Sequence, residues 1–201
     1  MDSGPGVRRA EPEDLEPAVE ALAAAFYDDP AWIHLMPDPG DRVERLLRFF
    51  SEVLSHADPV ATDVWVTDDG SGAAVWKAPG RWSSDPLETV RSGPSMWRVF
   101  GRRLPLATRT LMRVERRHPR RPDHWYLQFL GVVPARQGQG LGSRLMGPLL
   151  GRLDEGRLPA FLEASTDRSR ALYERHGFDV TATFHMPRRG PLLRQMWRDP
   201  R

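Results

Sequence analysis

One stretch of the chain, residues 132–142, constrains the fold more than any other. It joins an apolar, strand-like run over 125–133 to a segment in which leucines recur every four residues from Leu141 to Leu153, the spacing of one helical face. A strand that passes through a glycine-rich turn into a helix is a unit of α/β proteins, so we expect a mixed sheet flanked by helices. The turn aims unpaired backbone N–H groups and the positive end of the helix dipole at one point, which favours a phosphate-bearing ligand.

Spacing separates three kinds of phosphate-binding loop. A Walker loop needs Gly-Lys-Ser/Thr, whereas the single lysine of the chain, Lys77, is far from the turn. A dinucleotide fingerprint that starts at Gly138 would place its last glycine where Ser143 stands. What remains is a Gln-x-x-Gly-x-Gly pattern that begins at Gln137. The alternative without a ligand, a tight turn only, is disfavoured by the Val-Val-Pro before the glycines and the leucine stripe after them.

The Gln-x-x-Gly-x-Gly pattern resembles the acetyl-CoA pyrophosphate loop of the GNAT family of N-acetyltransferases. A second match lies in Leu162-Glu163, Tyr173 and Gly177-Phe178, which are similar to the other end of the family's core. Residues 23–26, 64–66 and 73–76, with Arg45 and 161–163, are similar to puromycin N-acetyltransferase and its relatives. The resemblance implies the GNAT fold: a mixed central sheet flanked by helices, with a helical or loop insertion before the central strand.

The length of 201 residues suits a single acetyltransferase domain. We expect an N-terminal part over 1–123 that contains acceptor-site elements and the insertion at 78–123, an acetyl-CoA-binding core over 124–180, and C-terminal strands over 181–201. The patterning predicts strands at 7–10, 64–67, 73–76, 125–133, 160–164, 178–184 and 192–197, and helices at 15–26, 41–56, 96–117, 141–153 and 168–175.

The resemblance implies that acetyl-CoA lies along the end of the central strand and the loop after it. Backbone N–H groups of the loop would hold the pyrophosphate, the strand end would contact pantetheine, and a backbone N–H near Val132 would polarise the acetyl carbonyl. Ser169 departs from the family pattern, which has asparagine there, so a side-chain contact to pantetheine at this position is in question. The expected cofactor-binding residues are Leu130, Val132, Val133, Gln137, Gly138, Gln139, Gly140, Leu141, Gly142, Ser143 and Ser169.

Two side chains are candidates for the proton transfers of amine acetylation. Tyr173 matches the family's tyrosine beside the CoA sulfur, and a phenol with a reference pKa near 10 is protonated at neutral pH. Glu163 stands in an apolar run, where burial would raise its pKa and suit it to accept the amine proton directly or through water. The alternatives are that Tyr173 only packs its helix on the sheet and that Glu163 faces a cleft or pairs with an arginine.

Aromatic walls with carboxylates would suit a cationic, partly aromatic amine. Trp125 and Phe129 fall in one strand and we expect them on one of its faces. The alternative is that Phe26 belongs to the apolar face of its helix and that the Asp-Asp-Pro run at 28–30 is ordinary turn chemistry. The candidate acceptor residues are Phe26, Tyr27, Asp28, Trp32, Trp125 and Phe129.

The resemblance implies direct transfer of the acetyl group of acetyl-CoA to a primary amine of a small molecule, such as an aminonucleoside or another antibiotic-like amine. Two other functions stay open. A protein or peptide N-acetyltransferase would need an open acceptor groove. A non-catalytic acyl-CoA-binding module would keep the loop and lose catalysis, and Ser169 is the one feature that favours it.

Composition sets limits on the function. The absence of cysteine excludes disulfides, thiolate metal sites and a cysteine nucleophile, and the histidines lack the pairing of a metal site. The net charge of +2 is too small to indicate a nucleic-acid partner, and the basic clusters at 116–121 and 188–189 are expected to be solvated loops. With no run of about eighteen apolar residues and no signal-peptide pattern, we expect a soluble, cytoplasmic protein without membrane partners. The oligomeric state is left open.

Overall fold

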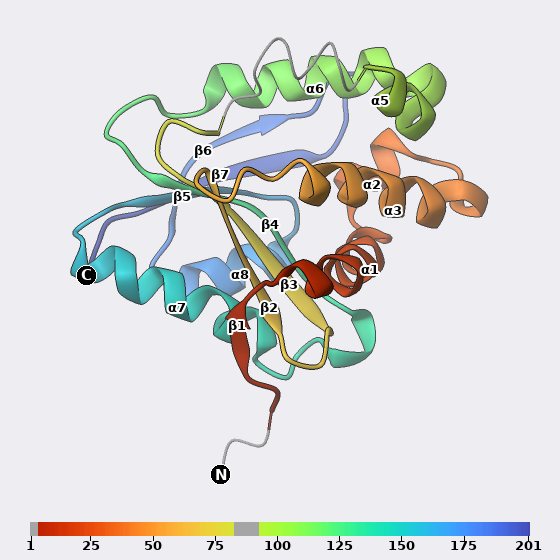
Figure 1. Cartoon of the computed structure of the whole chain (residues 1–201). Helices are drawn as coiled ribbons and strands as arrows, with labels where there is room; N and C mark the ends of the chain where they lie inside the picture. Colours follow the sequence, from red (N-terminus) through yellow and green to blue (C-terminus); the bar gives the residue numbers. More distant parts are fainter. Residues whose placement is uncertain (1–3, 83–92) are drawn as a thin grey trace.

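A computed structural model of the chain describes residues 4–82 and 93–201, and in it a seven-stranded sheet has helices on both faces (Figure 1). The strands are β1 (Val7–Arg9), β2 (Thr62–Thr67), β3 (Gly72–Lys77), β4 (Trp125–Val132), β5 (Ala160–Ala164), β6 (Asp179–His185) and β7 (Leu192–Arg198). The helices are α1 (Leu15–Phe26), α2 (Pro30–Leu35), α3 (Pro39–Ser55), α5 (Gly93–Phe100), α6 (Leu104–Arg117), α7 (Leu141–Glu155) and α8 (Asp167–Arg175), with 3-10 turns η1 (Pro12–Asp14), η2 (Gly101–Arg103) and η3 (Pro134–Arg136).

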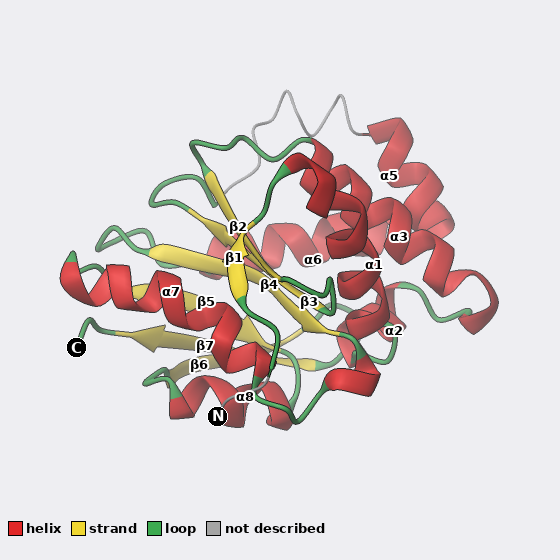
Figure 2. Cartoon of the chain, turned by 60° about the horizontal axis from the view of Figure 1, so that its bottom comes forward, coloured by secondary structure: helices red, strands yellow, loops and turns green. Residues whose placement is uncertain are grey.

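The sheet is mixed, as the strand–turn–helix unit predicts. Its strand order is β1-β2-β3-β4-β5-β7-β6, and the pair β4–β5 is parallel while the other neighbours are antiparallel. The parallel pair is connected through η3 and α7, because parallel neighbours need a crossover rather than a hairpin. Helices α7 and α8 cover one face of the sheet, and α1, α3, α5 and α6 cover the other (Figure 2).

The two central strands separate before they end. β4 pairs with β5 only from Trp125 opposite Ala160 to Leu127 opposite Leu162. Beyond these residues β4 continues to Val132 without a β5 partner. The strand edges in this gap carry backbone groups that need other partners, which makes the gap a place for a ligand.

A β-bulge at Gln128 changes which way the side chains of β4 point. In the register with β3, Trp76 lies opposite Leu127 and Val75 opposite Phe129, so that Gln128 has no counterpart. Leu127 therefore packs in one core and Phe129 in the other. The prediction that Trp125 and Phe129 share a face is wrong, because regular alternation is interrupted by this extra residue.

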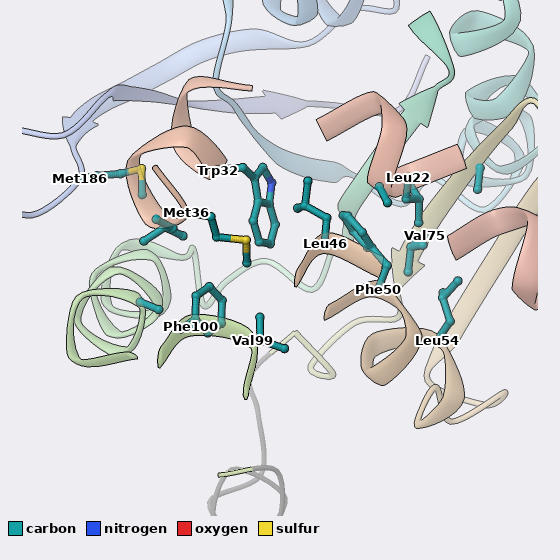
Figure 3. Packing of buried hydrophobic residues seen from close by; sticks show 14 of the residues in the cluster. Leu22, Trp32, Met36, Leu46, Phe50, Leu54, Val75, Val99, Phe100 and Met186 are labelled. Carbon is teal, nitrogen blue, oxygen red and sulfur yellow. The ribbon is translucent and has the colours of Figure 1, made fainter. Parts of the chain in front are cut away.

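Two hydrophobic cores lie on the two faces of the sheet. The first is built around Trp32, Leu46 and Phe50 of α2 and α3, between the sheet and the helices α1, α5 and α6 (Figure 3). The second contains the leucine stripe of α7, whose side chains at Leu145 and Leu149 are fully buried. The four-residue leucine spacing thus marks the face of α7 that contacts the sheet.

The insertion before β4 differs in detail from the prediction of one helix over 96–117. It consists of α5 and α6, separated by η2, where Gly101 has a φ of 49°. Pro105 falls in the first turn of α6, where no intrahelical N–H bond is lost. Helix α2, with six residues, is too short to show a period and was missed by the sequence patterns. The part of the insertion at 83–92 lies outside the described residues.

Candidate functional site

A cavity of about 1790 Å³ opens at the gap between β4 and β5. Its walls come from the glycine-rich turn and α8 at one end, and from α1, α2, α3, α5 and α6 at the other. Pockets for a single small ligand usually measure about 300–1,000 Å³. The cavity therefore has room for two molecules side by side, one at each end.

The turn before α7 has the geometry of an anion cradle. Gly138 and Gly140 have φ values of 80° and 81°, in the left-handed region that favours glycine. The first intrahelical bond of α7 runs from the Arg144 N–H to the Gly140 carbonyl, 3.1 Å. The N–H groups of Leu141, Gly142 and Ser143 precede that bond, so they have no acceptor within the helix and point along its positive end. The residues present fit a pyrophosphate group.

Side chains of the turn hold it in place. The Gln137 Nε2 donates to the Val132 carbonyl at 3.0 Å, and the Arg136 guanidinium forms an ion pair with Asp69 at 3.0 Å. The Val133 N–H is bonded to the Ser71 carbonyl at 2.9 Å. Arg136 is thus tied to the β2–β3 turn.

The predicted cofactor residues fall into two groups. Most of them line the cavity, whereas Val133 and Gln139 are not among the lining residues. The Gln139 side chain instead donates to the Ala135 carbonyl at 3.4 Å. The residues that the structure brings to the cavity are Leu130, Val132, Gln137, Gly138, Gly140, Leu141, Gly142, Ser143 and Ser169.

Ser169 stabilises the N-terminus of α8 through its hydroxyl group. It is the third residue of α8 and forms a capping box with Thr166. The Ser169 hydroxyl donates to the Thr166 carbonyl at 3.0 Å, and the Thr166 hydroxyl accepts from the Ser169 N–H at 3.0 Å. The Ser169 hydroxyl is therefore hydrogen-bonded within the first turn of α8.

Tyr173 both packs α8 and lines the cavity. Its side chain is 7% exposed and packs edge-on against Phe178, with 6.1 Å between the ring centroids. Burial raises the pKa of the Tyr173 phenol well above its usual value, and the nearby Asp29 carboxylate raises it further. The phenol is thus protonated at neutral pH, which is the form that can donate a proton.

Glu163 lines the cavity from β5, with Gln195 of β7 directly opposite in the sheet. Burial raises the pKa of Glu163 to about 7, and contacts with Tyr126 and Gln195 act in the opposite direction. Its Oε1 atom is buried and has no hydrogen-bond partner among the described residues. Half-protonated at neutral pH and with one oxygen open, Glu163 has the properties of a general base.

Asp29 follows the predicted acceptor residue Asp28 and also lines the cavity. Its carboxylate caps α2 by accepting from the Ala31 N–H at 2.8 Å, and it also accepts from the Ser165 hydroxyl at the end of β5. Burial raises its pKa, and the hydrogen bond from Ser165 opposes this effect. The Asp-Pro pair in the sequence indicates that Asp29 caps the start of a helix. That Asp29 also lies close to β5 and Tyr173 is a tertiary contact, which the sequence pattern does not indicate.

The far end of the cavity has aromatic walls. Phe26, Trp32 and Phe129 line it together, and Phe49 of α3, which sequence reasoning missed, joins them with 4.6 Å between the ring centroids of Trp32 and Phe49. Asp28 also lines the cavity.

Two predicted acceptor residues are not among those that line the cavity. The Tyr27 hydroxyl donates to the Pro39 carbonyl at 3.2 Å and its ring lies under the Arg42 guanidinium, 5.0 Å away. Trp125 packs in the second core, on the α7 side.

His118 and His124 form a buried pair beside Tyr126. Their Nε2 atoms are 2.9 Å apart, and the His124 Nδ1 is 2.8 Å from the Pro122 carbonyl. Because a carbonyl only accepts, the His124 Nδ1 carries the proton and its Nε2 accepts from His118. Burial lowers the pKa of His118 to about 3, so the pair is neutral. The His118 ring packs edge-on against Tyr126, 4.8 Å between centroids, and so supports a residue that contacts Glu163.

Two absences concern the described part of the chain. Across residues 4–82 and 93–201 no three histidine or carboxylate side chains come together as a group able to hold a metal ion. In the same residues no helix combines the length and the apolar content that crossing a membrane requires.

The sequence of this chain is similar to known N-acetyltransferases. The sequence pattern of the Acetyltransferase (GNAT) family matches residues 102–178. A curated Schizosaccharomyces pombe protein described as an uncharacterized N-acetyltransferase is 29% identical over 195 residues, which is 90% of this chain and 77% of that protein.

Solved structures agree with the sequence comparisons. A Corynebacterium glutamicum protein described as histone acetyltransferase HPA2 and related acetyltransferase is 26% identical, with a TM-score of 0.75 over 98% of this chain and 97% of that one. Arylalkylamine N-acetyltransferase 2 of Aedes aegypti shares the fold, with a TM-score of 0.56 at 14% identity over 97% of this chain and 98% of that one. The family pattern over residues 102–178, the curated relative and the solved structures together support the assignment of this chain to the GNAT family of N-acetyltransferases, as an acetyl-CoA-dependent acyltransferase.

Proposed function

We propose that the protein transfers the acetyl group of acetyl-CoA directly to a primary amine of a small molecule. The observation that carries this proposal is the cavity of about 1790 Å³, which runs without a break from the glycine-rich turn to the aromatic walls. Tyr173 and Glu163 both line it. A donor and an acceptor molecule would thus meet beside a proton donor and a base.

The donor end fits acetyl-CoA. The N–H groups at the start of α7 would bind the pyrophosphate, with Gly138 and Gly140 holding the turn in its left-handed conformation. A side chain at either glycine would project into open space, so the cradle is free for the ligand. The unpaired edge of β4 near Leu130 and Val132 would hold pantetheine by backbone hydrogen bonds. Acetyl-CoA, when bound, supplies an activated acetyl group as a thioester.

Three residues would handle the protons and charges of the reaction. Glu163 would accept a proton from the amine, because its raised pKa lets the carboxylate form compete for that proton near neutral pH. Tyr173 would donate its phenolic proton to the departing thiolate sulfur. Asp29, fixed by Ser165 and by the start of α2, would favour a cationic amine in this region of the cavity.

The acceptor end supports a compact amine with an apolar or aromatic body. Phe26, Trp32, Phe49 and Phe129 supply aromatic surface, which binds both apolar groups and cations. An aminonucleoside, suggested by the resemblance to puromycin N-acetyltransferase, and a phenylalkylamine both have this character. The Aedes aegypti relative, named an arylalkylamine N-acetyltransferase, is consistent with the second.

A protein acceptor is the second candidate function. It is favoured by the description of the Corynebacterium glutamicum structure, which names a histone acetyltransferase. A lysine side chain would have to enter past α5 and α6, whose residues line the same cavity. A non-catalytic acyl-CoA-binding module is disfavoured by the presence of Tyr173 and Glu163 in the cavity. The serine at position 169, where the family pattern has asparagine, is explained by its role in the capping box of α8.

One assay separates these functions. The protein is incubated with acetyl-CoA and a panel of phenethylamine, tryptamine, puromycin, spermidine and a lysine-containing histone peptide, and free CoA is measured. We expect turnover with one or more of the aromatic amines. Turnover with the peptide alone would establish a protein acceptor, and no turnover together with tight acetyl-CoA binding would establish the binding module.

A further inference from the structure

The bulge in β4 places an unassigned side chain at the point where the two central strands separate. Leu127 and Leu162 are the last paired residues of β4 and β5, so the next residues, Gln128 and Glu163, flank the start of the gap. Both line the cavity. Since Gln128 has no counterpart in β3, its conformation is set by the bulge and not by regular strand pairing.

Gln128 and Glu163 share an uncommon property. The Gln128 Oε1 and the Glu163 Oε1 are both buried, and neither has a hydrogen-bond partner within the described residues. An unpaired buried acceptor is costly, and most such atoms in proteins are paired. Two of them on neighbouring strands at one cavity indicate a ligand that brings hydrogen-bond donors.

The side chains next to the Glu163 carboxyl group define where this ligand would bind. Tyr126 and Gln195 contact the Glu163 carboxyl group. Gln195 is itself held by the Arg117 carbonyl, to which its Nε2 donates at 2.9 Å. The Glu163 Oε1 and the Gln128 Oε1 are therefore left open for a donor that comes from the cavity.

We propose that Gln128 binds the acceptor amine, and that its Oε1 and the Glu163 Oε1 together select a primary amine. This inference rests on the proposed function. A neutral primary amine has two N–H groups and one lone pair. One N–H would donate to Glu163, which accepts that proton, and the other would donate to Gln128, which leaves the lone pair directed at the thioester carbonyl carbon. A secondary amine has a single N–H and leaves one of the two oxygens unpaired.

The first experiment measures binding without turnover. Each amine of the panel is titrated calorimetrically into the protein saturated with CoA, and the tightest-binding one is used as the probe. Gln128→Leu removes the oxygen at similar size, and we expect the Kd of that amine to rise about fivefold to tenfold, the value of one hydrogen bond. The Kd of CoA should change by less than twofold. An unchanged Kd for the amine, or equal weakening of amine and CoA, overturns the inference.

The second experiment measures selectivity. In the wild-type protein, kcat/KM for phenethylamine should exceed that for N-methylphenethylamine, and Gln128→Leu should reduce this ratio by about fivefold to tenfold. A ratio that does not change overturns the assignment of Gln128 even where turnover itself is normal.

A third variant keeps the proposal testable if Gln128→Leu does not fold. Gln128→Glu retains an oxygen and adds a charge beside Glu163, so we expect the acidic limb of the pH–kcat/KM profile to move to higher pH. An unmoved limb shows that the two side chains are not neighbours and overturns the inference. Failure of the proposed function is distinguishable, because the wild-type protein would then acetylate none of the small amines, whatever the Gln128 variants do.

Discussion

The two ends of the cavity are built in different ways. At the donor end, the N–H groups of Leu141, Gly142 and Ser143 are free at the start of α7, and the turn before them needs glycine at 138 and 140 because of their φ values and not because of what surrounds them. At the acceptor end, side chains from α1, α2, α3 and β4 meet although they are far apart in the sequence. A backbone site is specified locally and binds one kind of group, whereas a site assembled from side chains changes with each element that contributes to it.

The donor end can be tested by filling its cradle, which should have the largest effect. Gly140→Trp introduces a large side chain at a φ of 81°, in the space where the pyrophosphate would lie. We expect the rise in Tm caused by acetyl-CoA to disappear. Gly147→Trp, at an exposed glycine of the same helix, is the matched control and should keep the rise. If Gly140→Trp still shows the full rise, the turn is not the pyrophosphate site.

The substitution Tyr173→Phe tests the proposed general acid, which lies between the donor end and the acceptor end of the cavity. Loss of the phenolic proton donor should lower kcat by about 10²–10⁴-fold, the usual contribution of a general acid. Acetyl-CoA binding, measured by the shift in Tm, should be retained, because the loop is untouched. Tyr27→Phe is the matched control: its ring is not part of the cavity wall, and kcat should not change. Equal rates for the wild type and Tyr173→Phe would remove Tyr173 from the acid role.

The acceptor side should show a pH dependence that the donor side lacks. Burial raises the pKa of Glu163 to about 7. The group is protonated below this pH and a carboxylate above it, so kcat/KM for the amine should rise with pH through about 7 and then level off. Glu163→Gln should abolish this limb and lower the rate, whereas Glu155→Gln, at an exposed carboxylate of α7, should leave the profile as it is. A limb that persists in Glu163→Gln would belong to another group, such as Asp29.

The smallest effect on acetyl-CoA binding is expected from a substitution at Ser169, the donor-end position where this chain has serine and the family pattern has asparagine. Ser169→Asn restores the asparagine but removes the hydroxyl that donates to the Thr166 carbonyl. We expect the protein to lose about 0.5–1 kcal/mol of stability through the weakened cap, while the Kd of acetyl-CoA changes by less than about threefold. A large gain in acetyl-CoA affinity would instead show that position 169 is a pantetheine contact that this chain has given up.

Sequence patterns predicted much of the fold because each pattern reports a local property. The leucine spacing of α7, the apolar run of β4 and the glycines before the helix follow from helical and strand periods and from φ restrictions. The single helix predicted over 96–117 divides at η2, and α2 was missed, because a break or a six-residue helix leaves little periodic signal. Trp125 and Phe129 were assigned to one face because a bulge has no signature in alternating residues.

The glycine-rich turn shows what the sequence determined by itself. Its spacing, together with Leu162-Glu163 and Tyr173, was enough to identify the family, since a cradle made of backbone N–H groups needs only the right order of glycines and a following helix. The tertiary structure alone decided the other half of the site. It brought Asp29 to Ser165, set Gln195 opposite Glu163 and left Gln128 without a strand partner. Contacts between distant segments depend on packing and register, and no short motif encodes these.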